Sequence, residues 1–299
     1  MPDMLTRRAM LLSPLALAAA KTTSFAQDGM TLAMHQNTSS GAGYRGSLEG
    51  WARAGIQYVE LNAGLVDQFL ETDTMAAARR VLTDNGLTPV SGSVGVGSLW
   101  EPSPDNAAAL DTLRRRCEMF AELGLEKVYG STGASGTYTE ADYDTAVDNV
   151  RQAGEVAAEF DQLMMIEFIR NSTFISTLTT TLRLTRSAGN VQPMLDFYHF
   201  LTGLSQVGDL DLLRPGEIAH VHFQDVPNVP RELLTGQTRA IPGTGIAPLT
   251  QVLRTLQEKG YAGPLSVELF LYQQDDPYEM ARQTRESAEP VMREAGVLR

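Results

Sequence analysis

The chain has 299 residues, and its 36 acidic and 24 basic side chains give a formal net charge of −12. A surface this acidic repels nucleic acid and anionic membranes, which argues against both as partners. Cys117 is the only cysteine, so an intrachain disulfide is excluded. We interpret it as a structural thiol in a helix.

Residues 1–26 have the composition of a twin-arginine-type signal peptide. An arginine pair at 7–8 precedes a short apolar run at 9–20, and 24–26 offers a small-residue cleavage site. The run is shorter than the ~20 residues that cross a bilayer. An ordinary secretory signal or an uncleaved anchor is the alternative. We expect a periplasmic or secreted protein in which 27–299, with a net charge of −14, is one domain.

From residue 30 onward, short apolar runs alternate with longer stretches of helical period. The predicted strands are 30–38, 58–62, 88–96, 127–133, 162–169, 191–200, 218–226 and 264–271. The predicted helices are 44–55, 74–86, 105–124, 139–160, 174–189, 207–216, 247–260 and 277–296. Several of these helices end at glycine, as left-handed C-caps prefer.

Strands that alternate with helices indicate a parallel sheet in an α/β fold. Eight units in about 250 residues predict a closed (β/α)8 TIM barrel. An open doubly wound sheet is the alternative, but the Gly-x-Gly-x-x-Gly pattern of dinucleotide-binding folds does not follow the first strand.

In such a barrel the active site lies at the carboxyl ends of the strands. All four histidines of the chain fall there, together with four carboxylates. The candidates are His35, Glu60, Glu167, Asp196, His199, His220, His222 and Glu268.

Four of these candidates sit inside apolar strands, where a lone charge costs several kcal/mol. Glu167, Asp196, His222 and Glu268 come from four successive strands, with no Lys or Arg among them. A divalent cation could neutralise such a group. Because the set is rich in oxygen and lacks thiolate, it suits Mn²⁺, Mg²⁺ or Co²⁺ better than structural Zn²⁺. The cofactor we expect is Mn²⁺, with Mg²⁺, Co²⁺ or Zn²⁺ as alternatives.

These residues resemble the metal quartet of the xylose-isomerase-like TIM barrels. Within that group the chain is similar to the sugar phosphate isomerase/epimerase proteins, such as ketose 3-epimerases, hydroxypyruvate isomerase and inosose dehydratase. The resemblance rests on "MLDFYHF" (194–200), "HVHFQD" (220–225) and "PGTGIAPLTQVLRTLQEKGYAGPLSVELF" (242–270). It covers 27–299 and is strongest over 160–270.

The resemblance implies that the quartet binds the metal and that Glu167 and Glu268 also act as acid and base. It implies that His199 contacts a substrate hydroxyl. Family members carry a substrate-binding arginine shortly after the strand-seven histidine. Here that spacing falls on Asn228, and the nearest candidate is Arg231.

Four further residues have two interpretations each. Glu60 contacts substrate or hydrogen-bonds backbone at a strand end, and His35 is expected at the substrate rather than the metal. Trp100 stacks on a sugar or packs on a neighbouring helix. His220 shares the inward parity of His222 and either supports it from below or is a hydrogen-bonded core residue.

The function expected is a metal-dependent sugar isomerase or epimerase that moves a proton next to a carbonyl through an enediolate. A dehydratase or lyase of a keto-sugar or 3-keto-glycoside would use the same site. A non-catalytic periplasmic carbohydrate-binding barrel is the rival from another class, and a metal-dependent nuclease is disfavoured by the negative charge. The expected partner is a small carbohydrate; whether the chain forms a homo-oligomer stays open.

Overall fold

Eight parallel strands close into a single barrel in the order β1 to β8, which confirms the predicted (β/α)8 fold. The computed structural model describes residues 29–299, so the signal predicted at 1–26 lies outside the described residues. The strands are β1 (Thr31–His35), β2 (Tyr58–Asn62), β3 (Thr88–Ser93), β4 (Lys127–Ser131), β5 (Leu163–Glu167), β6 (Val191–Asp196), β7 (Val221–His222) and β8 (Pro264–Val267).

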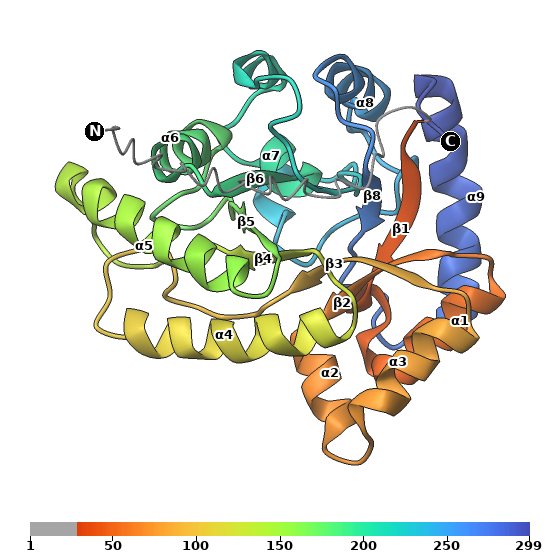
Figure 1. Ribbon diagram of the computed structural model, residues 1–299. Helices are drawn as coiled ribbons and strands as arrows, with labels where there is room; N and C mark the ends of the chain where they lie inside the picture. Colours follow the sequence, from red (N-terminus) through yellow and green to blue (C-terminus); the bar gives the residue numbers. More distant parts are fainter. Residues whose placement is uncertain (1–28) are drawn as a thin grey trace, which may run out of the picture.

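Helices surround the barrel, as Figure 1 shows. The α-helices are α1 (Gly43–Arg53), α2 (Ala63–Leu70), α3 (Met75–Asp84), α4 (Asn106–Glu122), α5 (Glu140–Ala158), α6 (Leu178–Ala188), α7 (Phe197–Thr202), α8 (Leu249–Glu258) and α9 (Pro277–Ala295). Short 3₁₀ helices follow at η1 (Gln36–Ala42), η2 (Val207–Leu212) and η3 (Arg231–Leu233). Over the part of the chain that the structure describes, none of these helices has the length and apolarity needed to cross a bilayer.

The structure differs from the predicted elements at α2, which was not predicted, and around strands six and seven. The run at 191–200 is not one strand, because β6 ends at Asp196 and α7 begins at Phe197. The Asp196 Oδ1 atom accepts the His199 backbone N–H at 2.7 Å and caps the new helix. The helix expected at 207–216 is the 3₁₀ turn η2, and β7 has two residues where 218–226 was predicted.

Strand alternation decides which side chains face the barrel axis. Tyr129, Met165, Met194 and Ala219 form a small buried cluster of their own. Met165 and Met194 are two residues before Glu167 and Asp196, so they share their inward parity and form the layer beneath the carboxylates. A much larger apolar core packs the strands against the helices. The layer of side chains at the carboxyl end of the barrel is therefore polar, and the layer beneath it is mainly apolar.

Candidate active site

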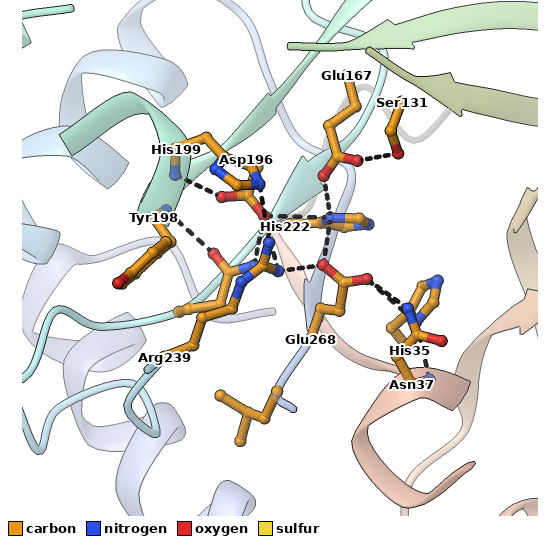
Figure 2. A network of polar contacts seen from close by, with 12 residues as sticks. His35, Asn37, Ser131, Glu167, Asp196, Tyr198, His199, His222, Arg239 and Glu268 are labelled. Carbon is orange, nitrogen blue, oxygen red and sulfur yellow. Dashed lines mark hydrogen bonds and ion pairs between the residues drawn. The ribbon is translucent and has the colours of Figure 1, made fainter. Parts of the chain in front are cut away.

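Four side chains from four adjacent strands meet at the carboxyl end of the barrel. Glu167, Asp196 and His222 are the last residues of β5, β6 and β7, and Glu268 directly follows β8. The His222 Nδ1 atom lies 2.9 Å from Glu167 Oε1, 3.3 Å from Glu268 Oε2 and 3.4 Å from Asp196 Oδ2. Figure 2 shows the three carboxylates turned toward this imidazole. All four residues are at most 3% exposed.

The spacing of these atoms fits a divalent cation. Metal–ligand bonds of about 2.1 Å at octahedral or tetrahedral angles separate neighbouring ligand atoms by about 3.0–3.4 Å. One ligand atom from each residue of the quartet lies within 4.8 Å of the others, and the contacts to the imidazole are 2.9–3.4 Å. Three carboxylate oxygens and one nitrogen form an oxygen-rich donor set. The residues predicted as metal ligands are thus brought together in a geometry that could hold the ion.

A fifth buried acid, Glu60 on β2, holds the imidazole from the opposite side. Its Oε1 lies 3.3 Å from His222 Nε2, and its Oε2 lies 2.8 Å from His220 Nε2. A carboxylate on the far nitrogen of a metal-binding histidine fixes the tautomer that leaves the near nitrogen free. His220 and His222 thus share Glu60 as a partner. Glu60 is fully buried, so the expectation of a substrate contact is wrong for this residue.

The charges of the site depend on one another. Burial by itself raises the pKa values of Glu268 and Asp196, but Arg239 and the neighbouring imidazoles outweigh it and hold both well below their usual range. Burial lowers the pKa of His222, yet Glu60 and the other surrounding acids raise it well above its usual value. These shifts favour ionised carboxylates and a protonated His222, so a cation at this position would compete with that proton.

A pocket of about 240 Å³ opens onto this group. Glu167, Glu268 and His199 line it, and the other lining residues are Asn37, Ser93, Tyr129, Ser131, Ile169, Gly236, Gln237, Arg239 and Phe270. A larger hollow of about 580 Å³ lies along α8, but no strand-end acid lines it. The chemistry therefore belongs to the smaller pocket, whose size suits a compact polar molecule.

His199 and His35 differ in their access to this pocket. His199 lines the pocket, whereas His35 is fully buried beneath the rim. The His35 Nδ1 atom accepts the Asn37 N–H at 2.9 Å, and its Nε2 lies 3.0 Å from the Tyr129 hydroxyl. Its neighbour Asn37 lines the pocket and donates its side-chain N–H to Glu268 Oε1 at 2.8 Å.

Two predicted substrate contacts are wrong. Trp100 is 1% exposed and donates its indole N–H to the Ser131 carbonyl at 3.2 Å, so neither ring face is open to a sugar. Arg231 lies in η3, where its guanidinium contacts the carbonyls of Thr202 and Gly203 at 3.4 Å. It is not among the pocket-lining residues.

The arginine of the pocket is Arg239, which sequence reasoning missed. Its Nη1 contacts Asp196 Oδ2 at 3.0 Å and also Glu268 Oε2, and its Nη2 lies 3.0 Å from His199 Nε2. The guanidinium is 4.7 Å from the centroid of the Phe270 ring. Because a carboxylate oxygen has two lone pairs, each acid can serve both Arg239 and a cation. Arg239 comes seventeen residues after His222, inside an irregular loop, and no local pattern marks it.

Comparison with solved structures agrees with this architecture. The chain superposes on the IOLI protein crystallised with a zinc atom, with a TM-score of 0.77 and 18% identity over 89% of this chain and 98% of that one. It superposes on D-psicose 3-epimerase in the presence of D-fructose with a TM-score of 0.71 and 18% identity, over 89% of this chain and all of that one. At these identities the likeness shows the fold alone.

Curated relatives match over shorter segments. An inosose isomerase of Halalkalibacterium halodurans is 31% identical over 129 residues, which are 42% of this chain and 46% of the relative. A 3-dehydroshikimate dehydratase of Pseudomonas putida is 28% identical over 168 residues, 54% of this chain and 26% of the relative. The chain thus spans less than half the length of these relatives. The family model described as "xylose isomerase-like TIM barrel" matches residues 48–295, and the chain belongs to that family.

Proposed function

We propose that this protein is a divalent-metal-dependent isomerase or epimerase of an unphosphorylated, sugar-like carbonyl compound. The observation that carries the proposal is the pair of glutamates that face both the metal position and the pocket. Glu167 and Glu268 each turn one oxygen to His222 and line the pocket as well. They come from β5 and β8, three strands apart around the barrel, so they reach a bound molecule from different sides.

A cation held by the quartet would polarise the substrate carbonyl and stabilise the oxygens of an enediolate. The chain's own residues then move the proton. Either glutamate removes it from the carbon next to the carbonyl, and the other returns it from its own side. The second oxygen of Glu167 accepts the Ser131 hydroxyl at 2.5 Å, and that of Glu268 accepts the Asn37 amide at 2.8 Å. These donors hold the two carboxylates in place for transfer.

Arg239 supports the same chemistry. Its guanidinium lines the pocket and is fully charged, so it would donate to substrate oxygens beside the metal position. It takes the role that was expected of Arg231. It is also the only Lys or Arg among the lining residues, and two carboxylates already balance it, which supports a substrate without a phosphate. The export signal predicted at 1–26 supports the same choice.

A dehydratase or lyase is the second candidate, and one observation favours it. The matched relative from Pseudomonas putida is a 3-dehydroshikimate dehydratase. Loss of a β-hydroxyl from the same enediolate would need no different residues, because a protonated glutamate would give its proton to the leaving hydroxyl, which departs as water. Proton transfer is the step that the two reactions share. Proton exchange on inosose and ketose substrates therefore tests the step that both reactions share. The identity of the product then shows whether the substrate is isomerised or dehydrated.

The test is C–H exchange in D₂O with a panel of ketoses, inososes and 3-keto-glycosides, using protein reconstituted with Mn²⁺. We expect about one bound ion per chain, exchange at one carbon, and loss of exchange in Glu167→Gln and Glu268→Gln. Glu258→Gln, on the exposed face of α8, is the matched control. If the protein binds about one metal ion per chain but catalyses no C–H exchange on any compound of the panel, the enzymatic proposal is refuted. A barrel that only binds its ligand would then be the remaining interpretation.

A further inference from the structure

The loop between β7 and α8 brings Arg239 to the pocket, and one buried carboxylate holds its two ends together. Asp225 is 2% exposed. Its Oδ1 accepts the backbone N–H groups of Val226 at 2.8 Å and Ala247 at 2.9 Å. Its Oδ2 accepts those of Gly243 at 3.0 Å and Gly245 at 2.9 Å. A single side chain thus ties the start of the loop to its last residues.

The backbone of Asp225 also ties down the residue next to the arginine. Asp225 and Ala240 exchange two hydrogen bonds, N–H to carbonyl, at 2.9 and 3.0 Å, as an antiparallel bridge. The far part of the loop is held by Tyr198, whose hydroxyl donates to the Thr235 carbonyl at 2.6 Å and lies 2.8 Å from Thr238 Oγ1. Arg239 therefore projects from a segment that is anchored on both sides.

The loop approaches Asp225 so closely that glycine is required at one point. A Cβ atom on Gly245 would lie 2.2 Å from the Val226 carbonyl oxygen and 2.5 Å from Asp225 Oδ1. No other residue type would allow the backbone N–H to reach the carboxylate there. The glycine and the acid together indicate a dedicated anchor, because an ordinary surface loop needs neither.

We propose that Asp225 is a positioning residue for Arg239: its carboxylate closes the 226–247 loop and so places the guanidinium between Asp196, Glu268 and His199. The role of Arg239 in the reaction rests on the proposed function. The position of its guanidinium does not depend on that function. A buried guanidinium is held in place only if its backbone is fixed, since the arginine side chain by itself has many rotamers. Without the anchor, four N–H groups lose their acceptor and the loop opens.

Limited trypsin digestion measures the placement directly, without any substrate. In the wild-type protein Arg239 is 3% exposed, so the bond after it is protected. We expect Asp225→Ala to be cut after Arg239 at least about tenfold faster under native conditions, since cleavage follows the population of the open loop. In Asp225→Asn the side-chain NH₂ group replaces one carboxylate oxygen, so two of the four backbone N–H groups lose their acceptor. This variant should also be cut faster after Arg239, and it keeps the test valid if the alanine variant misfolds.

Asp276→Ala is the matched control, because Asp276 caps the remote helix α9 through the Glu279 N–H at 2.9 Å. It should leave the bond after Arg239 protected. The thermal transitions of the Asp225 variants should first be shown to lie well above the assay temperature. If these folded variants resist cleavage after Arg239 as the wild type does, the proposal is overturned.

A double-mutant cycle then links the anchor to the reaction. If Asp225 acts through Arg239, Asp225→Ala should raise KM as Arg239→Met does, and the double variant should lose no more than the worse single variant. Additive losses would refute that link. Faster cleavage in a protein that catalyses no exchange would instead uphold the anchor and count against the proposed function alone.

Discussion

Replacing Glu60 by glutamine tests whether the site is built for a cation. Glu60 is fully buried and contacts His222 Nε2 at 3.3 Å and His220 Nε2 at 2.8 Å. Glutamine keeps the shape and one acceptor oxygen but removes the negative charge. Loss of such a partner behind a metal-binding histidine typically weakens metal affinity about 10–100-fold, or about 1.4–2.7 kcal/mol. We expect a loss in this range for Co²⁺ binding.

The size of that loss should depend on pH. Glu60 is among the groups that raise the pKa of His222, so in the wild-type protein a metal must first displace a strongly held proton. The glutamine variant binds this proton less tightly, which offsets part of its loss near neutral pH. As pH rises, the proton competes less with the metal in both proteins, so the offset shrinks. The affinity gap should therefore be wider at pH 8.5 than at pH 6.5.

The assay is calorimetric titration of chelator-treated protein with Co²⁺ at both pH values. Glu258→Gln, which removes an exposed acid from α8, is the control for net charge. Circular dichroism confirms that both variants are folded. If Glu60→Gln binds Co²⁺ as tightly as the wild type at both pH values, the carboxylate is only a structural partner of the two histidines, and the reasoning fails.

Three further predictions follow from the same geometry. Because the raised pKa keeps His222 protonated near neutral pH, metal binding should release about one proton and tighten as pH rises, seen as a buffer-dependent heat; no release would contradict this protonation state. Trp100→Phe should lower the free energy of unfolding, measured in urea, by about 1–3 kcal/mol, because packing is lost and the Ser131 carbonyl loses its donor. KM should stay unchanged; a large rise in KM would show that Trp100 does stack on the substrate. Arg231→Ala should leave both kcat and KM within about twofold, and a larger effect would show that η3 reaches the substrate.

Much of the fold and of the metal site was predictable from local sequence. Glu167, Asp196, His222 and Glu268 stand out because each is an ionisable residue in an apolar strand, and parallel strands must bring their ends to one rim. The alternation of strands and helices predicts the barrel for the same reason. It failed at 191–200, where Asp196 serves as both strand end and helix cap, and apolar content alone does not separate strand from helix.

The residues around the quartet could be placed only by the tertiary structure. Glu60 looks like a rim residue in sequence, yet it is buried against His222 of β7 and His220 just before that strand, three strands away from β2 around the closed barrel. Arg239 lies in an irregular loop that Asp225 holds through hydrogen bonds to Gly243 and Gly245. No periodic pattern in the sequence marks Arg239 or these bonds. Periodicity reports which face of an element is buried. Which side chain meets which across the barrel is decided by strand register and loop closure, and these exist only in the folded chain.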